Sequence, residues 1–552
     1  ENLQQFGNAV RLGSEVLGPF MTNYSDAGTS MGRQGRLGSR LLSRFTYTVD
    51  YPGKRLIAVP RADSFRSPER GYLGLWGVPH QGGMRVWIVQ PGSPADLAGM
   101  QPGHYLTVDG EAISTMSWPA LHDALNGPPN KAVELCRATE VEPDCRIAVF
   151  ADAAAPPALL PAQIPVVVRN ASVLNFTGEG AVLQPGQAVL IAEGKIQRVG
   201  ATDSVVAPRG AREVDAKGQV LMPGLVDMHV HVWDEAELPA YLAYGVTTVR
   251  NASGMPFLLD LAAAVTAGLL ATTAELGMTV MGHTPEGPRH DGIPSERPFV
   301  IPFDTVLDDR LTSIEHVESI VWHGLGERLD EAAMCRLAVD IAGADVPVTP
   351  TLVAHHNLLR VARSDGDYLQ RPGVDTLNPF IAQMEQPLYS FWSSQPATYR
   401  AQHEAFYLKA TDCLYRAGVT LLAGSDAGIF INVPGVSLLD ELELLQTAGL
   451  PAAAVLRSAT VNPAQVLGRA DRSGRVAEGF EADLVLLPGD PLQDLSVLRE
   501  PVAVVSDGRW FDRDARERLL QQATERSLPR SEQRILRALE VQGTDLEFLN
   551  NE

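Results

Sequence analysis

The sequence predicts a multidomain chain in which a TIM-like α/β barrel follows smaller β-rich units. At 552 residues the chain is too long for one ordinary domain. Between residues 223 and 469, apolar strand-like runs alternate with helical patterns, as in a closed parallel sheet covered by helices. Two histidines, one residue apart, end the first of these strands. The expected fold class is therefore multidomain α/β, with a site at the open end of the barrel.

The first 62 residues are expected to form strands and turns. They alternate apolar and polar positions with many glycines. Residues 38–45 and 49–52 resemble the end of a retropepsin-like aspartic protease domain. Such an enzyme needs paired Asp-Thr/Ser-Gly carboxylates that share a proton, and the nearest string, residues 26–29, lacks that pattern. Residues 1–62 are thus expected to be a β-rich fragment without catalysis of its own, cut from a longer, exported precursor.

Residues 69–150 resemble a PDZ domain. Residues 92–103, followed by 108–110, are similar to a segment of bacterial PDZ domains. The carboxylate-binding loop would consist of Tyr72, Leu73, Gly74 and Leu75. In such a module, consecutive backbone N–H groups bind a terminal carboxylate, while an open sheet edge adds the peptide as a strand. The resemblance implies a C-terminal peptide ligand, with a docking or packing role as the alternative.

The segments around the barrel follow from composition and pattern. Residues 151–162 are rich in Ala and Pro and form a linker. Short β-runs in residues 163–222 and again in 470–512 predict one small composite β-sandwich made from two separated pieces. Residues 513–552 are charged and helical, so they are expected to form a peripheral tail.

Charge limits the partners of the chain. Lys and Arg number 45 against 66 Asp and Glu, which gives a formal net charge of −21. Nucleic acid and anionic membranes have no electrostatic reason to bind such a surface. A small peptide or amide is the expected substrate, and the extent of the surface favours a homo-oligomer.

The four cysteines bear on the compartment. Cys136 and Cys145 flank a short polar stretch between two β-like runs, a spacing that suits a hairpin disulfide. Such a bond favours the periplasm or the outside of the cell, whereas two reduced thiols in the cytoplasm are the alternative. Cys335 and Cys413 lack metal-type spacing.

The strongest chemical signal is a pair of histidines at the end of an apolar run. His229 and His231 follow the strand-like residues 221–228. Because side chains alternate along a strand, both imidazoles point to the same side. At the C-terminal end of a barrel strand that side opens into the active site, so the pair could hold one divalent ion.

Three later apolar runs end in the same way. The residues at their ends are, in chain order, His283, His316 and Asp426. This order resembles the amidohydrolase superfamily, in its prolidase and imidazolonepropionase-like branch, from about residue 166 to residue 510. The resemblance implies that His229 and His231 bind the more buried metal and that His283 and His316 bind a second one. Asp426 would both ligate and act as general base and acid.

The implied cofactor is Zn²⁺, as two ions, with other divalent metals as alternatives. Bound zinc lowers the pKa of a water from about 15.7 towards 7 and polarises a carbonyl. The expected function is hydrolysis of an amide bond in a small peptide or acylated amino acid, as in a dipeptidase. Two other functions stay open: an inactive peptide-binding scaffold that uses the PDZ domain, and a mononuclear cyclic-amide hydrolase or deaminase.

One part of the resemblance is missing. Dinuclear members carry a carboxylated lysine on the fourth barrel strand, and no lysine lies between His231 and His283. The pattern also passes from the second strand almost directly to the fifth, although closure needs all eight. A segment near residue 270 that carries the lysine is therefore expected to be absent. The alternatives are a mononuclear site or a bridging carboxylate such as Glu275 or Glu286.

An insertion of roughly sixty residues separates the seventh and eighth strands. It lies on the side of the barrel where active sites form. Its aromatic residues are Phe380, Tyr389, Phe391, Trp392, Tyr399, Phe406 and Tyr407. They predict either a lid for an apolar or aromatic substrate or the packed core of an inserted helical pair.

Overall fold

The structure, a computed structural model, describes three continuous stretches of the chain: residues 160–253, 302–308 and 311–541. It also describes residues 281–282 and, between residues 2 and 152, a set of strands and short segments. No helix within these residues is long and apolar enough to cross a membrane.

Antiparallel strand pairs make up the described part of residues 1–62. The pairs are β1 (Asn2–Gly7) with β4 (Phe20–Ser25), β2 (Val10–Leu12) with β3 (Glu15–Leu17), and β5 (Phe45–Asp50) with β6 (Arg55–Pro60). The resemblance to a retropepsin-like domain stays a prediction.

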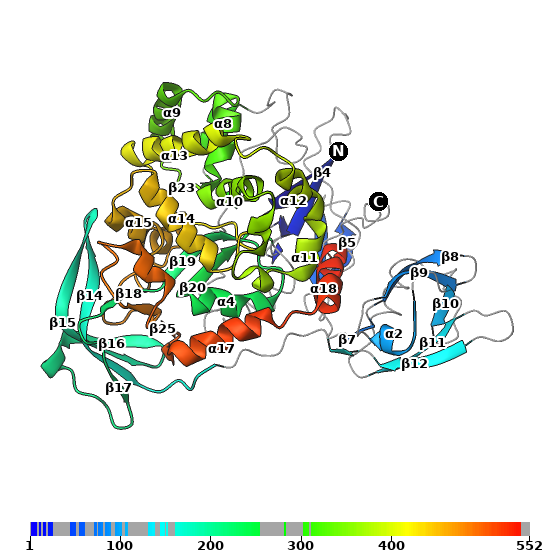
Figure 1. Ribbon diagram of the computed structural model, residues 1–552, viewed down its shortest axis with the longest axis horizontal. Helices are drawn as coiled ribbons and strands as arrows, with labels where there is room; N and C mark the ends of the chain where they lie inside the picture. Colours follow the sequence, from blue (N-terminus) through cyan, green and yellow to red (C-terminus); the bar gives the residue numbers. More distant parts are fainter. Residues whose placement is uncertain are drawn as a thin grey trace.

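A five-stranded antiparallel sheet follows and is set apart from the barrel in Figure 1. Its strands, in spatial order, are β8 (Leu75–His80), β9 (Gly83–Val89), β10 (Tyr105–Val108), β11 (Ala132–Arg137) and β12 (Asp144–Val149). The short helix α2 (Pro94–Leu97) packs on it. Met84, Val86 and Leu135 form a small apolar core with Ala95 of this helix.

The predicted peptide-binding loop precedes this sheet. Tyr72 ends β7 (Gly71–Tyr72), which pairs with β13 (Ala151–Asp152). Leu73 is buried, and its carbonyl accepts a hydrogen bond from the backbone N–H of Ala95 at 2.9 Å. Leu75 is also buried, whereas Gly74 lies outside the described residues. PDZ character and a peptide ligand stay predictions.

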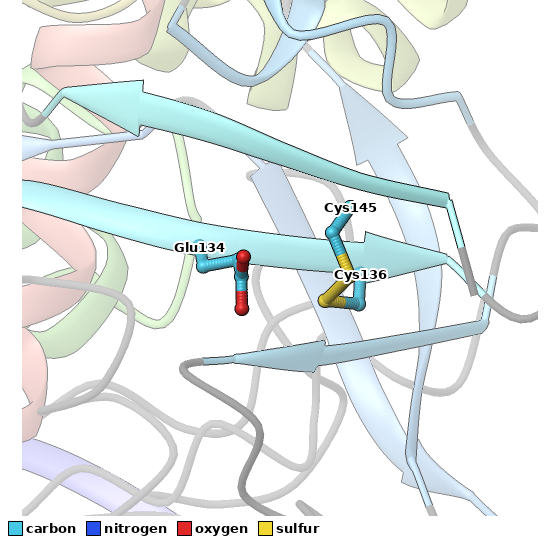
Figure 2. A group of neighbouring side chains, drawn as sticks. All are labelled: Glu134, Cys136 and Cys145. Carbon is cyan, nitrogen blue, oxygen red and sulfur yellow. A yellow bond between two sulfur atoms is a disulfide. The ribbon is translucent and has the colours of Figure 1, made fainter.

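Cys136 and Cys145 form a disulfide between β11 and β12 (Figure 2). The two residues are directly opposite in the antiparallel register. Glu134 lies close to the two sulfur atoms, but both thiols are consumed in the bond. This group therefore offers no thiolate to a metal, and the hairpin disulfide suggested by the sequence is the form that the structure has.

The two pieces on either side of the barrel meet in one eight-stranded sheet. The last strand of the first piece, β18 (Val220–Pro223), pairs antiparallel with β24 (Leu484–Leu487), the first strand of the second piece. The first piece contributes β14 (Val166–Thr177), β15 (Gly180–Ala192), β16 (Lys195–Ala201), β17 (Arg212–Asp215) and β18 (Val220–Pro223). The second contributes β24 (Leu484–Leu487), β25 (Ala503–Ser506) and β26 (Arg509–Phe511). This pairing fixes where the barrel begins, because β18 leads directly into its first strand.

Parallel strands form the barrel interior. They are β19 (Leu225–Val230), β20 (Val246–Asn251), β21 (Met281–Gly282), β22 (Ser313–Glu315) and β23 (Val348–Thr349). β19 pairs with β20, and β22 lies between β21 and β23. Parallel bridges join Val348 to Leu421 and Val230 to Ala427, so the segment before Asp426 takes the place of the eighth strand. Strands three and four would fall between β20 and β21, outside the described residues.

Helices surround these strands (Figure 1). Those of the barrel are α4 (Leu238–Ala243), α7 (Phe303–Asp308), α8 (Val317–Leu325), α9 (Glu331–Gly343), α10 (Leu352–Arg363), α13 (Ala401–Arg416), α14 (Val436–Thr447), α15 (Ala452–Ser458) and α16 (Val461–Val466). The insertion adds α11 (Pro379–Met384) and α12 (Gln386–Ser393). Its Tyr389 and Trp392 are buried in a cluster with Leu359 and Ile431, so these aromatics pack the insertion onto the barrel.

The C-terminal tail differs from the peripheral segment that its charge suggested. α17 (Arg513–Thr524) and α18 (Leu528–Val541) pack against the barrel. The guanidinium of Arg516 donates to the carbonyl of Ala243, at the end of α4, at 2.7 Å. Arg530 is buried and pairs with Asp234 at 3.2 Å. Arg530 thus neutralises a buried carboxylate of the barrel, and Arg516 satisfies a carbonyl at the end of α4.

A second disulfide joins Cys335 of α9 to Cys413 of α13. It closes a loop of 78 residues, for which the chain-entropy model gives a stabilisation of about 4.5 kcal/mol. We expect the double variant Cys335→Ser/Cys413→Ser to lose about that much free energy of unfolding in urea titrations. The matched control is Cys136→Ser/Cys145→Ser, whose bond spans only 9 residues and should cost less. An unchanged unfolding midpoint in the first variant would show that the bond does not constrain the unfolded chain.

Candidate active site

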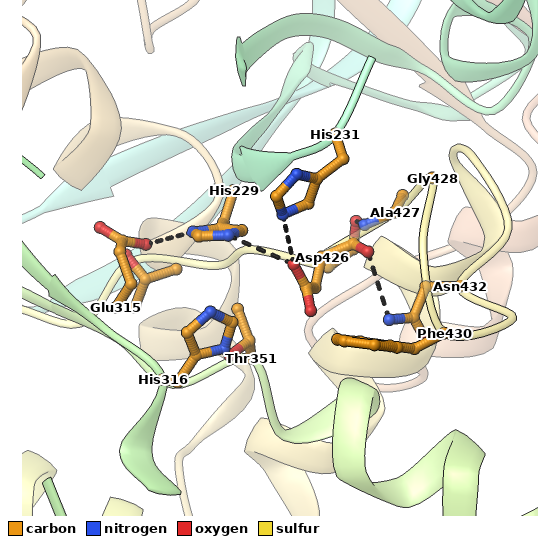
Figure 3. A network of polar contacts seen from close by, with 12 residues as sticks. His229, His231, Glu315, His316, Thr351, Asp426, Ala427, Gly428, Phe430 and Asn432 are labelled. Carbon is orange, nitrogen blue, oxygen red and sulfur yellow. Dashed lines mark hydrogen bonds and ion pairs between the residues drawn. The ribbon is translucent and has the colours of Figure 1, made fainter. Parts of the chain in front are cut away.

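Three of the predicted residues converge at the C-terminal end of the barrel (Figure 3). His229 and His231 come from the end of β19, and Asp426 follows the eighth-strand segment. The Nε2 atoms of the two histidines lie 3.2 Å and 3.0 Å from Oδ1 of Asp426. One ligand atom from each residue falls within 4.8 Å of the others. This spacing is compact enough for a single ion to contact all three.

Asp227 joins the first strand to the segment that carries Asp426. Its Oδ1 accepts hydrogen bonds from the backbone N–H of Ser425 at 3.0 Å and of His229 at 3.3 Å. Its Oδ2 accepts from the Ser425 hydroxyl at 2.5 Å. Burial raises the pKa of Asp227 to about 7, against these hydrogen bonds. The contacts hold His229 and Asp426 side by side.

Glu315 orients His229 from the opposite wall. Its Oε2 lies 2.7 Å from Nδ1 of His229. An imidazole that donates its Nδ1 proton to a carboxylate presents the Nε2 lone pair on its other side, which is the form that a metal binds. With a metal bound in place of the Nε2 proton, His229 would present this electron pair to the ion beside Asp426.

Arg250 neutralises the buried charge of Glu315. Its Nη2 lies 2.6 Å from Oε1 of Glu315, its Nη1 donates to the Ser313 hydroxyl at 2.8 Å, and its Nε donates to the Met228 carbonyl at 2.6 Å. Burial by itself would raise the pKa of Glu315, but Arg250 and His229 outweigh it and hold that pKa well below its usual range. The carboxylate is thus ionised and fixed in place.

His316 lies next to His229, with ring centroids 4.7 Å apart in an edge-on arrangement. Its Nδ1 is hydrogen-bonded to the Thr351 hydroxyl at 2.5 Å, and that hydroxyl donates to the Pro350 carbonyl at 2.8 Å. With the hydroxyl proton donated to the Pro350 carbonyl, Nδ1 of His316 is the donor to Thr351, and in this neutral tautomer Nε2 is the nitrogen with the lone pair. His316 and Asp426 both have positive φ, 65° and 54°, a costly conformation for such residues that clusters at functional sites.

The donor set fits a divalent cation. His229 Nε2 and both carboxylate oxygens of Asp426 are buried and have no hydrogen-bond partner among the described residues. Burial lowers the pKa of His229, yet Asp426 and Glu315 together raise it to about 9, so the site stabilises positive charge. Burial likewise opposes ionisation of Asp426, but the neighbouring histidines hold its pKa well below normal. Two neutral imidazoles and a carboxylate are ligands that zinc accepts.

Other predicted residues are not tested in the same way. His283 follows β21 directly but lies outside the described residues, as do Glu275 and Glu286. A second metal position and a bridging ligand therefore stay predictions. Of the predicted peptide-binding loop, Tyr72 ends β7 and Leu75 begins β8 of the five-stranded sheet.

Sequence reasoning missed the residues that support the ligands: Asp227, Arg250, Glu315 and Thr351. A usable signal was present for two of them. Asp227 and Glu315 are carboxylates inside apolar strand-like runs, and a buried charge is tolerated only when it is paired. No sequence signal connected Arg250 to Glu315, because their contact spans 65 residues.

Comparison with known proteins assigns a family to one segment of the chain. Residues 403–511 match the model of the amidohydrolase family. This segment includes Asp426 and the strands β24, β25 and β26. The match supports an amidohydrolase-type α/β fold, and the resemblance noted from the strand-end histidines extends the same class to the rest of the barrel as a prediction.

Three curated relatives share parts of the chain. Ochratoxinase of Aspergillus niger is 35% identical over 100 residues, which cover 18% of this chain and 20% of that protein. A deacetylase of Agrobacterium fabrum is 37% identical over 73 residues, 13% of this chain and 17% of that protein. Adenine deaminase 2 of Rhizobium etli is 27% identical over 363 residues, 59% of this chain and 54% of that protein.

The chain thus spans about a fifth of the first of these relatives. The crystal structure of A. niger ochratoxinase superposes with a TM-score of 0.40 and 17% identity, over 63% of this chain and 95% of that one. At that score the structural likeness carries no functional argument.

Proposed function

We propose that the chain is a metal-dependent hydrolase that cleaves an amide bond in a small peptide or acylated amino acid. The observation that carries the proposal is the convergence of one ligand atom each from His229, His231 and Asp426 within 4.8 Å at the barrel mouth. The amidohydrolase match of residues 403–511 supports it, because that segment contains Asp426. The related deacetylase supports an acylated substrate.

His229, His231 and Asp426 would hold a zinc ion, with His316 and His283 available for a second. When bound, zinc supplies Lewis-acid polarisation and lowers the pKa of a water towards 7. The carboxylate of Asp426 accepts the proton of the attacking water and passes it to the leaving amine nitrogen. Glu315 keeps His229 in one tautomer and orientation throughout, and Arg250 keeps Glu315 ionised.

A deaminase with a mononuclear site is the second candidate. Adenine deaminase 2 aligns with more than half of this chain, and the one three-residue histidine–carboxylate cluster within the described residues suits a single ion. Deamination of a ring uses the same attack of activated water at carbon, with ammonia as the leaving group. The third candidate function is a peptide-binding scaffold without catalysis. The hydrogen bond between His229 and Glu315 and the ion pair between Arg250 and Glu315 argue against it, because they orient a metal ligand.

The surroundings of the barrel complete the proposal. The two disulfides, Cys136–Cys145 and Cys335–Cys413, support a periplasmic or secreted location over the cytoplasm. A C-terminal peptide at the residue 69–150 unit and a homo-oligomeric state belong to the proposal as well. Neither nucleic acid nor a membrane is a proposed partner of a chain with a net charge of −21.

Metal content per chain tests this function first. We expect the purified protein to bind about two zinc ions, to hydrolyse members of a panel of dipeptides and acylated amino acids, and to lose turnover when a chelator removes the metal. Added zinc should restore it. One ion per chain with turnover of an adenine-type ring would favour the deaminase, and no metal with no turnover would leave the scaffold.

A further inference from the structure

The loop that follows Asp426 is held in an unfavourable backbone conformation. Phe430 and Ile431, two consecutive bulky residues, have φ of 54° and 62°. For residues with a β-carbon this left-handed region is costly, and it persists only where the surroundings impose it. Something in the molecule must therefore pull this loop into place.

The insertion supplies the first anchor. The carboxylate of Glu385, between α11 and α12, accepts the backbone N–H of Phe430 at 3.2 Å and 3.1 Å through its two oxygens. The Tyr389 hydroxyl donates to Glu385 at 2.5 Å and accepts the backbone N–H of Ile431 at 3.1 Å. Both residues with positive φ are thus held by one pair of side chains, of which Tyr389 is buried and Glu385 is partly buried.

Asn432 supplies the second anchor. Its side-chain amide donates to the carbonyl of Asp426 at 3.2 Å and accepts from the Asn357 amide, on α10, at 2.8 Å. The Gly428 N–H donates to the Asn432 carbonyl at 2.9 Å. The loop is therefore folded back onto Asp426 itself. Burial raises the pKa of Glu385 to about 7, and the charge of Asp426 adds to that rise, so the first anchor lies within electrostatic reach of the site.

The two anchors together fix the position of the Phe430 ring. Phe430 packs against the Tyr389 and Trp392 cluster of the insertion but stays only partly buried. Phe430 follows Asp426 by four residues on the same loop, and both side chains are drawn in Figure 3. The part of the ring that stays exposed is an apolar surface on the loop that carries Asp426.

We propose that Phe430, clamped by Glu385 and Tyr389, forms an apolar wall of the substrate site and selects substrates with an aromatic or large aliphatic side chain next to the scissile amide. This inference rests on the proposed hydrolase function and specifies its substrate. Glu385 and Tyr389 are positioning residues, because they act on substrate only through the loop. The insertion then serves selectivity, and its aromatic residues need not touch substrate themselves.

The test compares N-acetyl-phenylalanine with N-acetyl-alanine on the zinc-loaded full chain. We expect the wild type to prefer the aromatic substrate and Phe430→Ala to lower the ratio of the two kcat/KM values about tenfold, chiefly through KM for the aromatic substrate. Phe430→Leu, which keeps a large apolar side chain, should lower the ratio of the two kcat/KM values less than Phe430→Ala does. Tyr389→Phe, which removes the acceptor for Ile431, should shift the ratio in the same direction as Phe430→Ala.

Phe391→Ala is the matched control. Phe391 packs against Trp392 and Tyr399 in the same cluster, but it is on α12 and not on the Asp426 loop. An unchanged ratio in Phe430→Ala, or an equal fall in Phe391→Ala, overturns the proposal. If the wild type cleaves neither substrate, the proposed hydrolase function fails, and the proposed role of Phe430 needs a test that does not depend on turnover. Calorimetric titration with phenylalanine and with alanine supplies that test. A loss of affinity for phenylalanine alone in Phe430→Ala supports Phe430 as an apolar wall of the site, and an unchanged affinity for phenylalanine refutes it.

Discussion

We expect Asp426→Asn to lower kcat by about 10³-fold and to keep the fold of the wild type. General acid–base catalysis by one positioned group contributes about 10²–10⁴-fold, and asparagine keeps the shape of the side chain but cannot accept a proton at neutral pH. KM should change less than kcat, because the lost interaction belongs to the transition state. Steady-state kinetics on the best substrate of the wild type, with circular dichroism of both proteins, measures the effect.

Asp340→Asn is the control for that variant. Asp340 is an exposed carboxylate on α9, so its removal changes the net charge equally without touching the site. Its kcat should stay within about twofold of the wild type. If Asp426→Asn kept a tenth or more of the activity, another group would have to take the proton, and the role assigned to Asp426 would be wrong.

How much of this site was readable from sequence depends on the range of each interaction. His229 and His231 were predictable because alternation on one strand is a local property, and the apolar run before them marks a buried strand. Asp426 and His316 were predictable as further polar endings of apolar runs. Their proximity follows from the parallel barrel, in which strand ends meet at one face.

The supporting contacts were not readable, because they depend on closure of the barrel. The Arg250–Glu315 pair, the Cys335–Cys413 bond and the Glu385–Phe430 clamp each join segments that are distant in sequence. No local period encodes such contacts. The strained φ of Phe430 also contradicts its local preference, which is what a functional constraint imposed by the rest of the fold produces. The C-terminal tail was misjudged for the same reason, since its arginines have partners about 300 residues away.

Arg250→Met is expected to lower the free energy of unfolding by about 3–5 kcal/mol. The substitution keeps much of the side-chain volume but leaves the fully buried carboxylate of Glu315 without its cationic partner, and an unpaired buried charge costs that much. His229 should also lose its fixed orientation, with about a 10–100-fold loss of zinc affinity. Urea titration measures the first effect, and competition with a zinc chelator measures the second.

A double-mutant cycle separates the buried charge from lost packing. Arg250→Met/Glu315→Gln removes both charges, so it should recover a large part of the stability lost in Arg250→Met, whereas zinc affinity stays low because no carboxylate then orients His229. Arg198→Met provides the matched control: its pair with Glu478 is exposed and should contribute less than about 1 kcal/mol. If the double variant were as unstable as Arg250→Met, the loss would come from packing and not from the unpaired charge. The metal site would then be held by the shape of the barrel interior, and the ion pair would serve only to set the tautomer of His229.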